Sequence, residues 1–357
     1  MAFIVTVATD FPPHYYEQET LTTMLREEFW KERHSNLDRL EQFHRHMRVN
    51  GRYLALPLEC YESGKLAGFG ARNDAWIRVA TDLGETTICS LLVQAQLPAE
   101  DVAKLVTTTV TGVAAPSLDA RLMNRIPFSA SLKRVPLFGL GCVGGAAGVA
   151  RVADYLQGHP EDAAILLAVE LCSLTLQPDD FSIANVISSG LFGDGAAAVL
   201  MVGSEHWLAR PEQPRVIDSR SLFFPDTEEV MGWTVTDTGF KVVLNAAVPE
   251  IARDRLRPAV ESFLADHNLC LDDISHWIAH PGGPKVIQAL EQGLGLDEEA
   301  LHLSRKSLAQ VGNISSASIL LILRETLARY QPPPGTYGLM MAMGPAFCAE
   351  LVLLHWS

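Results

Sequence analysis

The sequence predicts an α/β protein whose helices cover mostly buried sheets, and three observations support this class. Short β-type apolar runs alternate with amphipathic helical segments along both halves of the chain. Several of these runs, such as AAILLAVELCS at 163–173, are almost uninterrupted, as in strands covered on both faces. With 357 residues, of which 48% are hydrophobic, the chain can bury a large core. A composition shift at 207–214 predicts two halves, residues 1–209 and 210–357.

The composition limits the partners and the compartment. A formal net charge of −14 and a pI of about 5.2 argue against nucleic acid as the main partner, although a local basic patch could still bind an anionic cofactor. The six cysteines show no CxxC pair and no metal-ligand spacing, and no signal peptide is apparent after Met1. We therefore expect no metal site, reduced thiols and a cytoplasmic location.

The N-terminal segments combine a short strand with charged helices. An apolar β-type run at 2–11 is halted by Pro12-Pro13, and a helical, charged region follows over 16–47. Basic side chains then cluster at His44, Arg45, His46, Arg48 and Arg52. This cluster is either a solvated surface or an anion clamp for a phosphate-bearing cofactor, and the sequence leaves both open.

The rest of the first half alternates helices and buried strands. We expect a helix at 73–96, a strand at 107–111 whose end lines a pocket, and a strand, turn and helix over 135–156. Glu170, at the end of an apolar strand, either caps a turn at the surface or is paired inside. Asp194 lies between two glycines before the next strand, which favours a turn former over a catalytic acid. No glycine loop is followed by GK[ST], so a P-loop is excluded.

The second half opens with charged and aromatic loop sequence at 218–240 and then alternates again. We expect helices at 249–267, 285–296 and beyond Gly312, and a strand at 274–280. The most apolar stretch, 337–356, contains glycine, proline and glutamate. This composition indicates two buried strands joined by a Gly-Pro turn and argues against a membrane span.

Three residues at strand ends or helix starts are candidates for chemistry. Cys142 follows an apolar run and Gly139-Leu140-Gly141, and it stands where an amphipathic helix begins, so the helix N-terminus would stabilise its thiolate. His280 ends a strand, and Asn313 precedes a helix rich in small residues. A thiol needs a base such as histidine, and an amide N–H can stabilise an oxyanion, so the three together predict acyl transfer. Singly, they could be a buried cysteine, a shielded strand end and a helix cap.

At these positions the chain resembles type III polyketide synthases, the chalcone and stilbene synthase family of the thiolase superfamily. The resemblance is carried by GCVGGAAG at 141–148, LFGDGAAA at 191–198, WIAHPGGP at 277–284, GNISSAS at 312–318 and the 343–345 turn. It implies a thiolase-like αβαβα sandwich built from two similar halves and, usually, a homodimer. It also implies CoA thioesters, malonyl-CoA and acyl-CoA, as substrates, with no permanently bound cofactor.

The resemblance also implies roles for single residues. Cys142 would carry the primer and the growing chain as a thioester, while His280 would keep the thiolate ion-paired. With Asn313, His280 would hydrogen-bond the thioester carbonyl of malonyl-CoA during decarboxylation. Phe192 resembles the gatekeeping phenylalanine between the CoA tunnel and the cavity. Arg45 falls where the family places a CoA phosphate contact, although the neighbouring family lysine is Gln42 here.

Seven positions match those that shape the family's cavity: Val110, Thr111, Cys172, Thr175, Trp233, Val242 and Ser315. Plant members carry glycine where Trp233 falls and phenylalanine near Val242. The difference is compatible with a tunnel for an aliphatic chain, as in bacterial alkylpyrone and alkylresorcinol synthases. It is equally compatible with a repacked wall that has no meaning for the substrate.

The sequence therefore predicts an iterative synthase that loads an acyl-CoA primer, a fatty acyl group in the leading hypothesis, on Cys142 and cyclises the product to an alkylpyrone or alkylresorcinol. The alternative within the class is a malonyl-primed tetrahydroxynaphthalene-type synthase. A second alternative is a single-condensation ketoacyl synthase of the initiating type, which would need a basic docking patch that the net charge of −14 does not favour. A non-catalytic protein with this fold would lack one of the three candidates, and none is missing.

Overall fold

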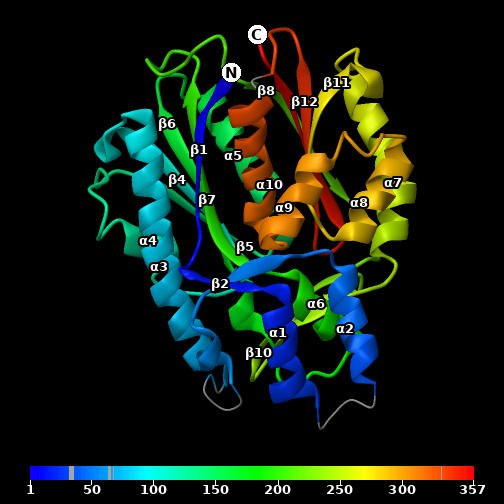
Figure 1. Cartoon of the computed structure of the whole chain (residues 1–357). Helices are drawn as coiled ribbons and strands as arrows, with labels where there is room; N and C mark the ends of the chain where they lie inside the picture. The colour runs from blue at the N-terminus through cyan, green and yellow to red at the C-terminus, as the bar shows by residue number, and fades with distance from the viewer. Residues whose placement is uncertain (32–35, 63–65, 67, 331) are drawn as a thin grey trace.

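A mixed sheet of nine strands organises the computed structural model, which describes residues 1–31, 36–62, 66, 68–330 and 332–357 (Figure 1). Its order is β11-β12-β13-β8-β1-β7-β6-β4-β5. The pairs β4–β5, β4–β6 and β11–β12 are parallel, and the remaining neighbours are antiparallel. The strands are β1 (Ala2–Asp10), β4 (Val102–Thr109), β5 (Lys133–Phe138), β6 (Ala163–Leu171), β7 (Asp194–Gly203), β8 (Arg215–Phe223), β11 (Ile274–Ala279), β12 (Tyr337–Gly344) and β13 (Cys348–His355).

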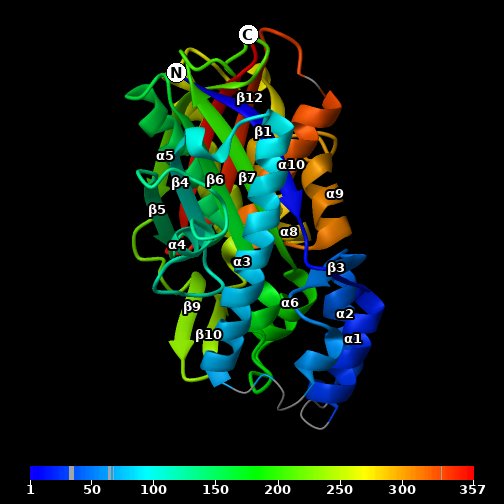
Figure 2. The ribbon, with the colours of Figure 1, turned by 90° about the vertical axis from the view of Figure 1, so that its left-hand side faces the viewer.

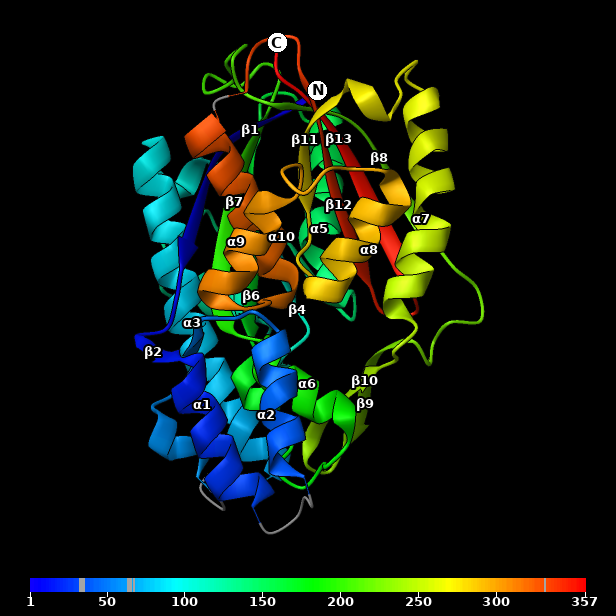
Figure 3. The same ribbon diagram turned by 45° about the vertical axis from the view of Figure 1, so that its right-hand side comes forward.

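Helices lie on both faces of this sheet and within its fold. Helix α3 (Gly68–Ala95) covers β1, β6 and β7 from outside, while α7 (Val248–Ala265) and α8 (Pro284–Leu294) form a core with β12 and β13 on the other side. Helices α5 (Gly144–Gln157) and α10 (Ser315–Glu325) lie in the middle and contact strands from both ends of the sheet order (Figure 3). The αβαβα sandwich that the resemblance implies is therefore confirmed.

Complete burial explains why the central strands are uninterrupted apolar runs. Every residue of β6 and of β7 is buried, because α3 covers one face of the pair and α5 and α10 cover the other. The middle layer is thin because its helices carry glycines at their contacts. A Cβ on Gly145 would lie 2.2 Å from the Ser316 carbonyl oxygen, and one on Gly148 would lie 2.4 Å from Leu166. These glycines let the helices approach the sheet and each other.

The two halves meet where β8 pairs with both β13 and β1. The predicted loop at 218–240 is wrong, because this segment contains much of β8, all of β9 (Met231–Thr236) and the start of β10 (Gly239–Leu244). Asp218 and Arg220 stand between Val216 and Leu222 at a spacing of two, so these polar residues conceal the alternation of the strand. The exact boundary predicted at 209/210 stays a prediction.

A separate layer lies beneath the sandwich (Figures 1 and 2). It contains β2 (His14–Glu17), α1 (Gln18–Leu25), the π-helix η1 (Arg26–Trp30), α2 (Leu37–His46), β3 (Gly51–Leu54), α6 (Ile183–Leu191) and the hairpin β9–β10. The continuous helical region predicted over 16–47 is thus divided into several elements, and residues 32–35 lie outside the described residues. Strand β2 pairs with β3, which ties the N-terminal helices to the segment that follows them.

The other predicted elements occur close to their expected positions. The remaining elements are α4 (Leu118–Leu122), α9 (His302–Val311), the π-helix η7 (Thr326–Tyr330) and the short 3₁₀ turns η2 (Leu58–Tyr61), η3 (Ala99–Asp101), η4 (Gly141–Val143), η5 (Cys172–Thr175) and η6 (Leu271–Asp273). Strands β12 and β13 form the predicted final hairpin. Within the described part of the chain, no helix is long and apolar enough to cross a membrane.

Candidate active site

Cys142 lies in the turn η4 between β5 and α5, as the sequence predicts. Gly141 adopts a φ of +55°, and a Cβ there would lie 2.7 Å from the Pro345 ring, so the turn both needs the left-handed region and packs closely on the β12–β13 turn. The Cys142 Sγ donates a hydrogen bond of 3.8 Å to the Ser315 hydroxyl, from the start of α10. The nucleophile candidate is therefore held between elements of both halves.

The surroundings of the Cys142 sulfur favour the neutral thiol. Burial raises the pKa of Cys142 to about 12, and the nearby Glu170 raises it further. Hydrogen bonds with Ser315 and Asn313 lower this pKa and offset part of the effect. A thiolate therefore needs a proton acceptor beside the sulfur.

His280 directly follows β11 and is 4% exposed. Its backbone N–H donates to the Met341 carbonyl at 2.9 Å, yet neither ring nitrogen has a hydrogen-bond partner among the described residues. Burial lowers the pKa of His280 to about 3, so the imidazole is neutral at physiological pH. A buried imidazole with both nitrogens free is unusual, and it leaves a donor and an acceptor available to a bound molecule.

Asn313 is fixed by backbone bonds to the segment that contains Phe192. Its N–H donates to the Leu191 carbonyl at 2.9 Å, and its carbonyl accepts from the Gly193 N–H at 2.9 Å. The Asn313 Oδ1 accepts from the Ser315 N–H at 2.8 Å, which leaves the amide NH₂ to point elsewhere. The structure brings Asn313 and Cys142 into hydrogen-bonding contact, whereas the His280 ring has no such contact with either.

Glu170 is paired inside, which decides between the two alternatives for this residue. One of its oxygens accepts from the Val110 N–H at 3.1 Å and the Thr111 hydroxyl at 3.0 Å, and the other accepts from the Ser316 hydroxyl. Burial raises the pKa of the Glu170 carboxyl. These bonds join the end of β4 to α10, so Val110, Thr111 and Ser315 all lie around this carboxyl and Cys142.

The other predicted cavity residues line one cavity of about 50 Å³. It is lined by Cys172, Thr175, Trp233, Val242 and the predicted gatekeeper Phe192, together with residues of α1, β3 and α6. Trp233 and Val242 face each other as a cross-strand pair of the β9–β10 hairpin. The hairpin is held by aromatic contacts of Phe240 with Trp233, Phe138 and Phe69 at centroid distances of 6.1, 6.2 and 5.2 Å.

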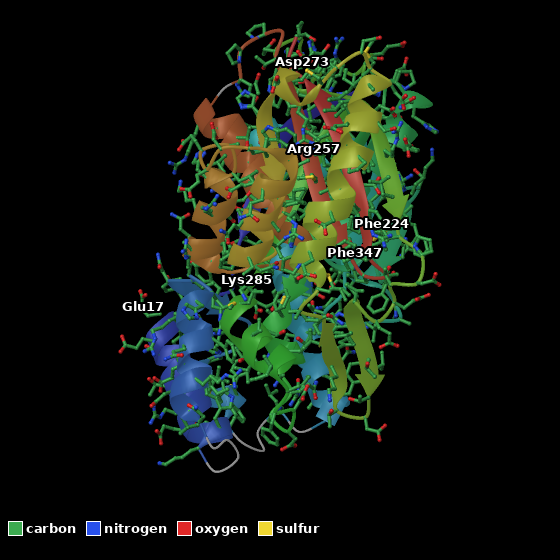
Figure 4. All side chains as sticks on the ribbon, turned by 90° about the vertical axis from the view of Figure 1, so that its right-hand side faces the viewer. Glu17, Phe224, Arg257, Asp273, Lys285 and Phe347 are labelled. Carbon is green, nitrogen blue, oxygen red and sulfur yellow. The ribbon has the colours of Figure 1, made fainter. Side chains whose placement is uncertain are left out.

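The basic cluster is divided between surface and interior. Arg45, His46 and Arg48 are exposed, and Arg45 lies 4.0 Å from Glu41 on the same helix. His44 and Arg52 are buried, which neither a solvated surface nor an anion clamp at the surface predicts. In Figure 4, Lys285 at the start of α8 lies where the sandwich meets the N-terminal layer, near α2.

Asp194 is neither a simple turn former nor an exposed acid. It is fully buried at the start of β7, and its carboxyl accepts from the N–H groups of Ser173 and Ala55 and from the Ser173 hydroxyl. Tyr61 in turn bonds the Ser173 hydroxyl at 2.6 Å. Sequence reasoning missed this network because Ala55, Tyr61 and Ser173 are far from Asp194 in the chain and carry no motif of their own.

Two chemical features follow for the whole site. All six cysteines are free thiols. Among the described residues, no group of three or more histidine, cysteine, aspartate or glutamate side chains could hold a metal ion. The arrangement offers a nucleophilic sulfur, an unpaired imidazole and an amide, which are suited to acyl transfer.

Comparison with known proteins covers nearly the whole chain. The model of the N-terminal domain of chalcone and stilbene synthases matches residues 1–206, and the model of their C-terminal domain matches residues 216–356. A 1,3,6,8-tetrahydroxynaphthalene synthase of Streptomyces peucetius subsp. caesius is 48% identical over 353 residues, which cover 99% of this chain and 93% of the relative. A putative chalcone synthase of Bacillus subtilis (strain 168) is 36% identical over 367 residues, covering 100% and 99%.

The fold matches solved structures equally well. The crystal structure of 1,3,6,8-tetrahydroxynaphthalene synthase from Streptomyces coelicolor A3(2), a bacterial type III polyketide synthase, superimposes with a TM-score of 0.92. The two chains are 30% identical, and 99% of each is covered. The resemblance that the sequence motifs indicated therefore extends over both halves of the chain.

Proposed function

Because the chain belongs to the chalcone and stilbene synthase family and is a type III polyketide synthase, we propose that it primes itself with malonyl-CoA and makes a tetrahydroxynaphthalene-type product. Enzymes of this class catalyse decarboxylative condensation of malonyl-CoA and use CoA thioesters as substrates without a permanently bound cofactor. The observation that carries the choice of primer is the 48% identity, over 99% of this chain, with a 1,3,6,8-tetrahydroxynaphthalene synthase.

The loading step begins at Cys142. The neutral imidazole of His280 accepts the thiol proton as the sulfur attacks the thioester carbonyl of the primer, and the CoA thiolate leaves and takes a proton. The high pKa of the isolated thiol makes this acceptor necessary. His280 suits the task because its pKa, lowered by burial, keeps the ring unprotonated and both nitrogens are free.

The condensation step uses the same groups on a second substrate. His280 and the Asn313 amide hydrogen-bond the thioester carbonyl of malonyl-CoA, so that loss of CO₂ leaves a stabilised enolate. The enolate carbon attacks the acyl group on Cys142, forming one carbon–carbon bond and releasing the thiolate. Negative charge develops first on the enolate oxygen of the extender and then on the carbonyl oxygen of the acyl group on Cys142, and fixed donors beside the sulfur can stabilise both.

The relatives support a malonyl primer, and the cavity walls agree with a small group at that position. The cavity measures about 50 Å³ with its side chains as they stand, which is room for a few small atoms. Trp233 closes one wall and Phe192 another. The leading hypothesis of a fatty acyl primer and an alkylpyrone finds no support among the relatives, whereas the malonyl-primed alternative matches the relatives named as tetrahydroxynaphthalene synthases.

The product follows from counting carbons. A naphthalene skeleton contains ten carbons, which equal five two-carbon units, each left by one malonyl group after loss of CO₂. Phe192 would separate the CoA side of the site from this cavity, and the exposed Arg45 would approach a CoA phosphate. A single condensation on a carrier protein would need a basic docking surface, which a net charge of −14 disfavours.

A homodimer is the expected assembly. Strand β5 forms one edge of the nine-stranded sheet. Phe138 at the end of β5 is 53% exposed, and Val113, which follows β4 closely in the sequence, is 38% exposed. An unpaired edge with exposed apolar side chains is suited to association with a second copy. Light scattering of the purified protein should give twice the chain mass, and Phe138→Asp should shift it toward the monomer; a monomeric wild-type protein would contradict the assembly.

The test of the proposed function is mass spectrometry of the products. Purified protein receives malonyl-CoA alone or with a primer series from acetyl-CoA to long-chain acyl-CoA. We expect a tetrahydroxynaphthalene product from malonyl-CoA alone. Preferential formation of long-chain pyrones or resorcinols would overturn the choice of primer, and no polyketide with any primer would overturn the proposal as a whole.

A further inference from the structure

The cavity beside Cys172 contains a buried arginine. Arg52 lies on β3, is 3% exposed and lines the cavity together with the polar residues Ser188 and Ser189 of α6. The opposite walls are apolar and come from α1 and from the β9–β10 hairpin. The cavity is therefore polar at one end and apolar elsewhere, which is the usual design of a site that orients a small ligand.

Much of the hydrogen-bonding capacity of this polar end is unused. The Arg52 guanidinium donates through Nη2 to the Ser189 carbonyl, while Nε and Nη1 are buried without any partner. The Ser188 hydroxyl is also buried without a partner. Buried donors that face no acceptor are rare in folded proteins because each costs free energy, and a bound acceptor would remove that cost.

The positive charge of Arg52 is not neutralised by a direct ion pair. No carboxylate among the described residues lies within 4.0 Å of its guanidinium. Asp194 is the acidic residue that interacts electrostatically with Arg52, but the Asp194 oxygens already accept three hydrogen bonds from Ala55 and Ser173. Burial lowers the pKa of Arg52 to about 10, so it stays protonated at neutral pH. The cavity therefore holds a buried cation whose Nε and Nη1 donors have no partner, and a small bound anion would neutralise the charge and accept from them.

The position of Arg52 connects it to the reaction. Phe192 lines the cavity and forms a β-bridge with Asn313, whose side chain bonds with Cys142. A fatty acyl chain carries no charge that a guanidinium could neutralise. The small anion that the proposed substrate supplies is the free carboxylate of a malonyl group.

We infer that Arg52 and Ser188 bind the free carboxylate of a malonyl group that is loaded intact on Cys142 as the primer. This inference rests on the proposed function and explains how the active site would select its primer. In the loading step the Cys142–acyl bond forms and the thioester bond to CoA breaks, with the thiol proton passing to CoA. No CO₂ is released at this stage, so the primer keeps its carboxylate.

The salt bridge also protects the primer from premature decarboxylation. Loss of CO₂ requires the carboxylate electrons to move into the carbon chain, and a guanidinium that stabilises the carboxylate raises that barrier. The extender malonyl group meets His280 and Asn313 and releases its CO₂ with each new carbon–carbon bond. The primer loses its own CO₂ only after the growing chain has drawn the carboxylate away from Arg52.

The experiment compares Arg52→Met, Arg52→Lys and Ser188→Ala with the wild type. Arg257→Met is the matched control, because Arg257 lies on the outer helix α7 and pairs with Glu261 there (Figure 4). Each protein receives malonyl-CoA alone, or acetyl-CoA as primer with malonyl-CoA as extender. Intact-protein mass spectrometry after brief incubation distinguishes a malonyl from an acetyl adduct on Cys142.

We expect Arg52→Met to reduce the malonyl-only product about tenfold to a hundredfold relative to the acetyl-primed product, with Ser188→Ala giving a smaller shift in the same direction. Arg52→Lys should recover part of the ratio, and the malonyl adduct should disappear in Arg52→Met. An equal loss of both products would overturn the inference, since a structural role moves both. An acetyl adduct on the wild-type enzyme given malonyl-CoA would also overturn it, while absence of every polyketide would instead refute the proposed function.

Discussion

The reaction centre and the cavity next to it are built in different ways. Cys142, His280 and Asn313 stand at the ends of strands and at the starts of the middle helices, so the nine-stranded sheet and the α5–α10 layer position all three. The cavity takes its walls from α1, β3, α6 and the β9–β10 hairpin, which lie outside that sheet. The hairpin is a two-stranded sheet of its own, held mainly by aromatic contacts.

This difference shows how the two tasks are separated. The reaction centre cannot change without disturbing fully buried strands and glycine contacts below 3 Å. The walls of the cavity can change because a side chain such as Trp233 belongs to a hairpin that no central helix covers. Figure 4 labels Phe224 and Phe347, which lie at the end of β8 and at the start of β13, on the side of the sheet that faces this hairpin. Their ring centroids are 5.8 Å apart. We therefore expect the chemistry to depend on the core and the choice of primer to depend on the layer beneath it.

The largest expected effect comes from removing the nucleophile. Cys142→Ala should lower polyketide formation below about one-thousandth of the wild-type rate, because the proposed nucleophile that carries the acyl chain is lost. Labelled malonyl-CoA and product mass spectrometry measure the loss. Cys89→Ala, at an exposed cysteine of α3, is the matched control and should keep full activity. Residual product in Cys142→Ala would mean that the reaction centre is elsewhere.

The second prediction concerns the proton acceptor. Since burial raises the pKa of Cys142 to about 12 and lowers that of His280 to about 3, the thiolate forms only as pH rises, whereas neutral His280 is available throughout. His280→Gln should therefore slow alkylation of Cys142 by iodoacetamide about tenfold to a hundredfold at neutral pH. Its rate should then increase about tenfold for each pH unit. Identical pH profiles of the alkylation rate for the variant and the wild type would show that His280 does not accept the proton of Cys142.

The third prediction tests the rigidity of the core. Gly145→Ala should lower the free energy of unfolding by about 1–3 kcal/mol, because the new methyl group meets the Ser316 carbonyl of α10. Gly70→Ala is the control, since Gly70 lies in α3 with no atom within 4 Å of a Cβ there. Denaturant unfolding should leave this control unchanged or raise its stability by up to about 1 kcal/mol. A neutral Gly145→Ala would show that the middle layer can relax.

The smallest effect is expected at the cavity wall. Trp233→Ala should raise the yield from hexanoyl-CoA relative to malonyl-CoA alone by about tenfold, because the cavity gains room for methylene groups. Val235→Ala, at an exposed position of the same strand, should leave the ratio unchanged. An unchanged ratio in Trp233→Ala would place the determinant of primer length outside the hairpin. Product mass spectrometry measures both variants.

The sequence alone predicted the fold class, which the structure confirms, and the candidate reaction centre, and the reason is local. Uninterrupted apolar runs such as β6 report burial on both faces, and glycines such as Gly141 report a bend that other residues cannot adopt. The motifs around Cys142, His280 and Asn313 are contiguous stretches of sequence, because each of these backbone turns is short. These signals are visible in the linear sequence, so the sandwich and the three candidate residues could be predicted from it.

The tertiary structure decided what distant segments do together. The alternating pattern of β8 was concealed by its polar residues, and the basic cluster gave no sign that Arg52 is buried while Arg45 is exposed. The cavity unites residues of five or more separate elements, and only their packing leaves Arg52 and Ser188 without partners. Burial and unpaired donors depend on neighbours far along the chain. No local pattern encodes them, so the choice of primer could not be read from the sequence.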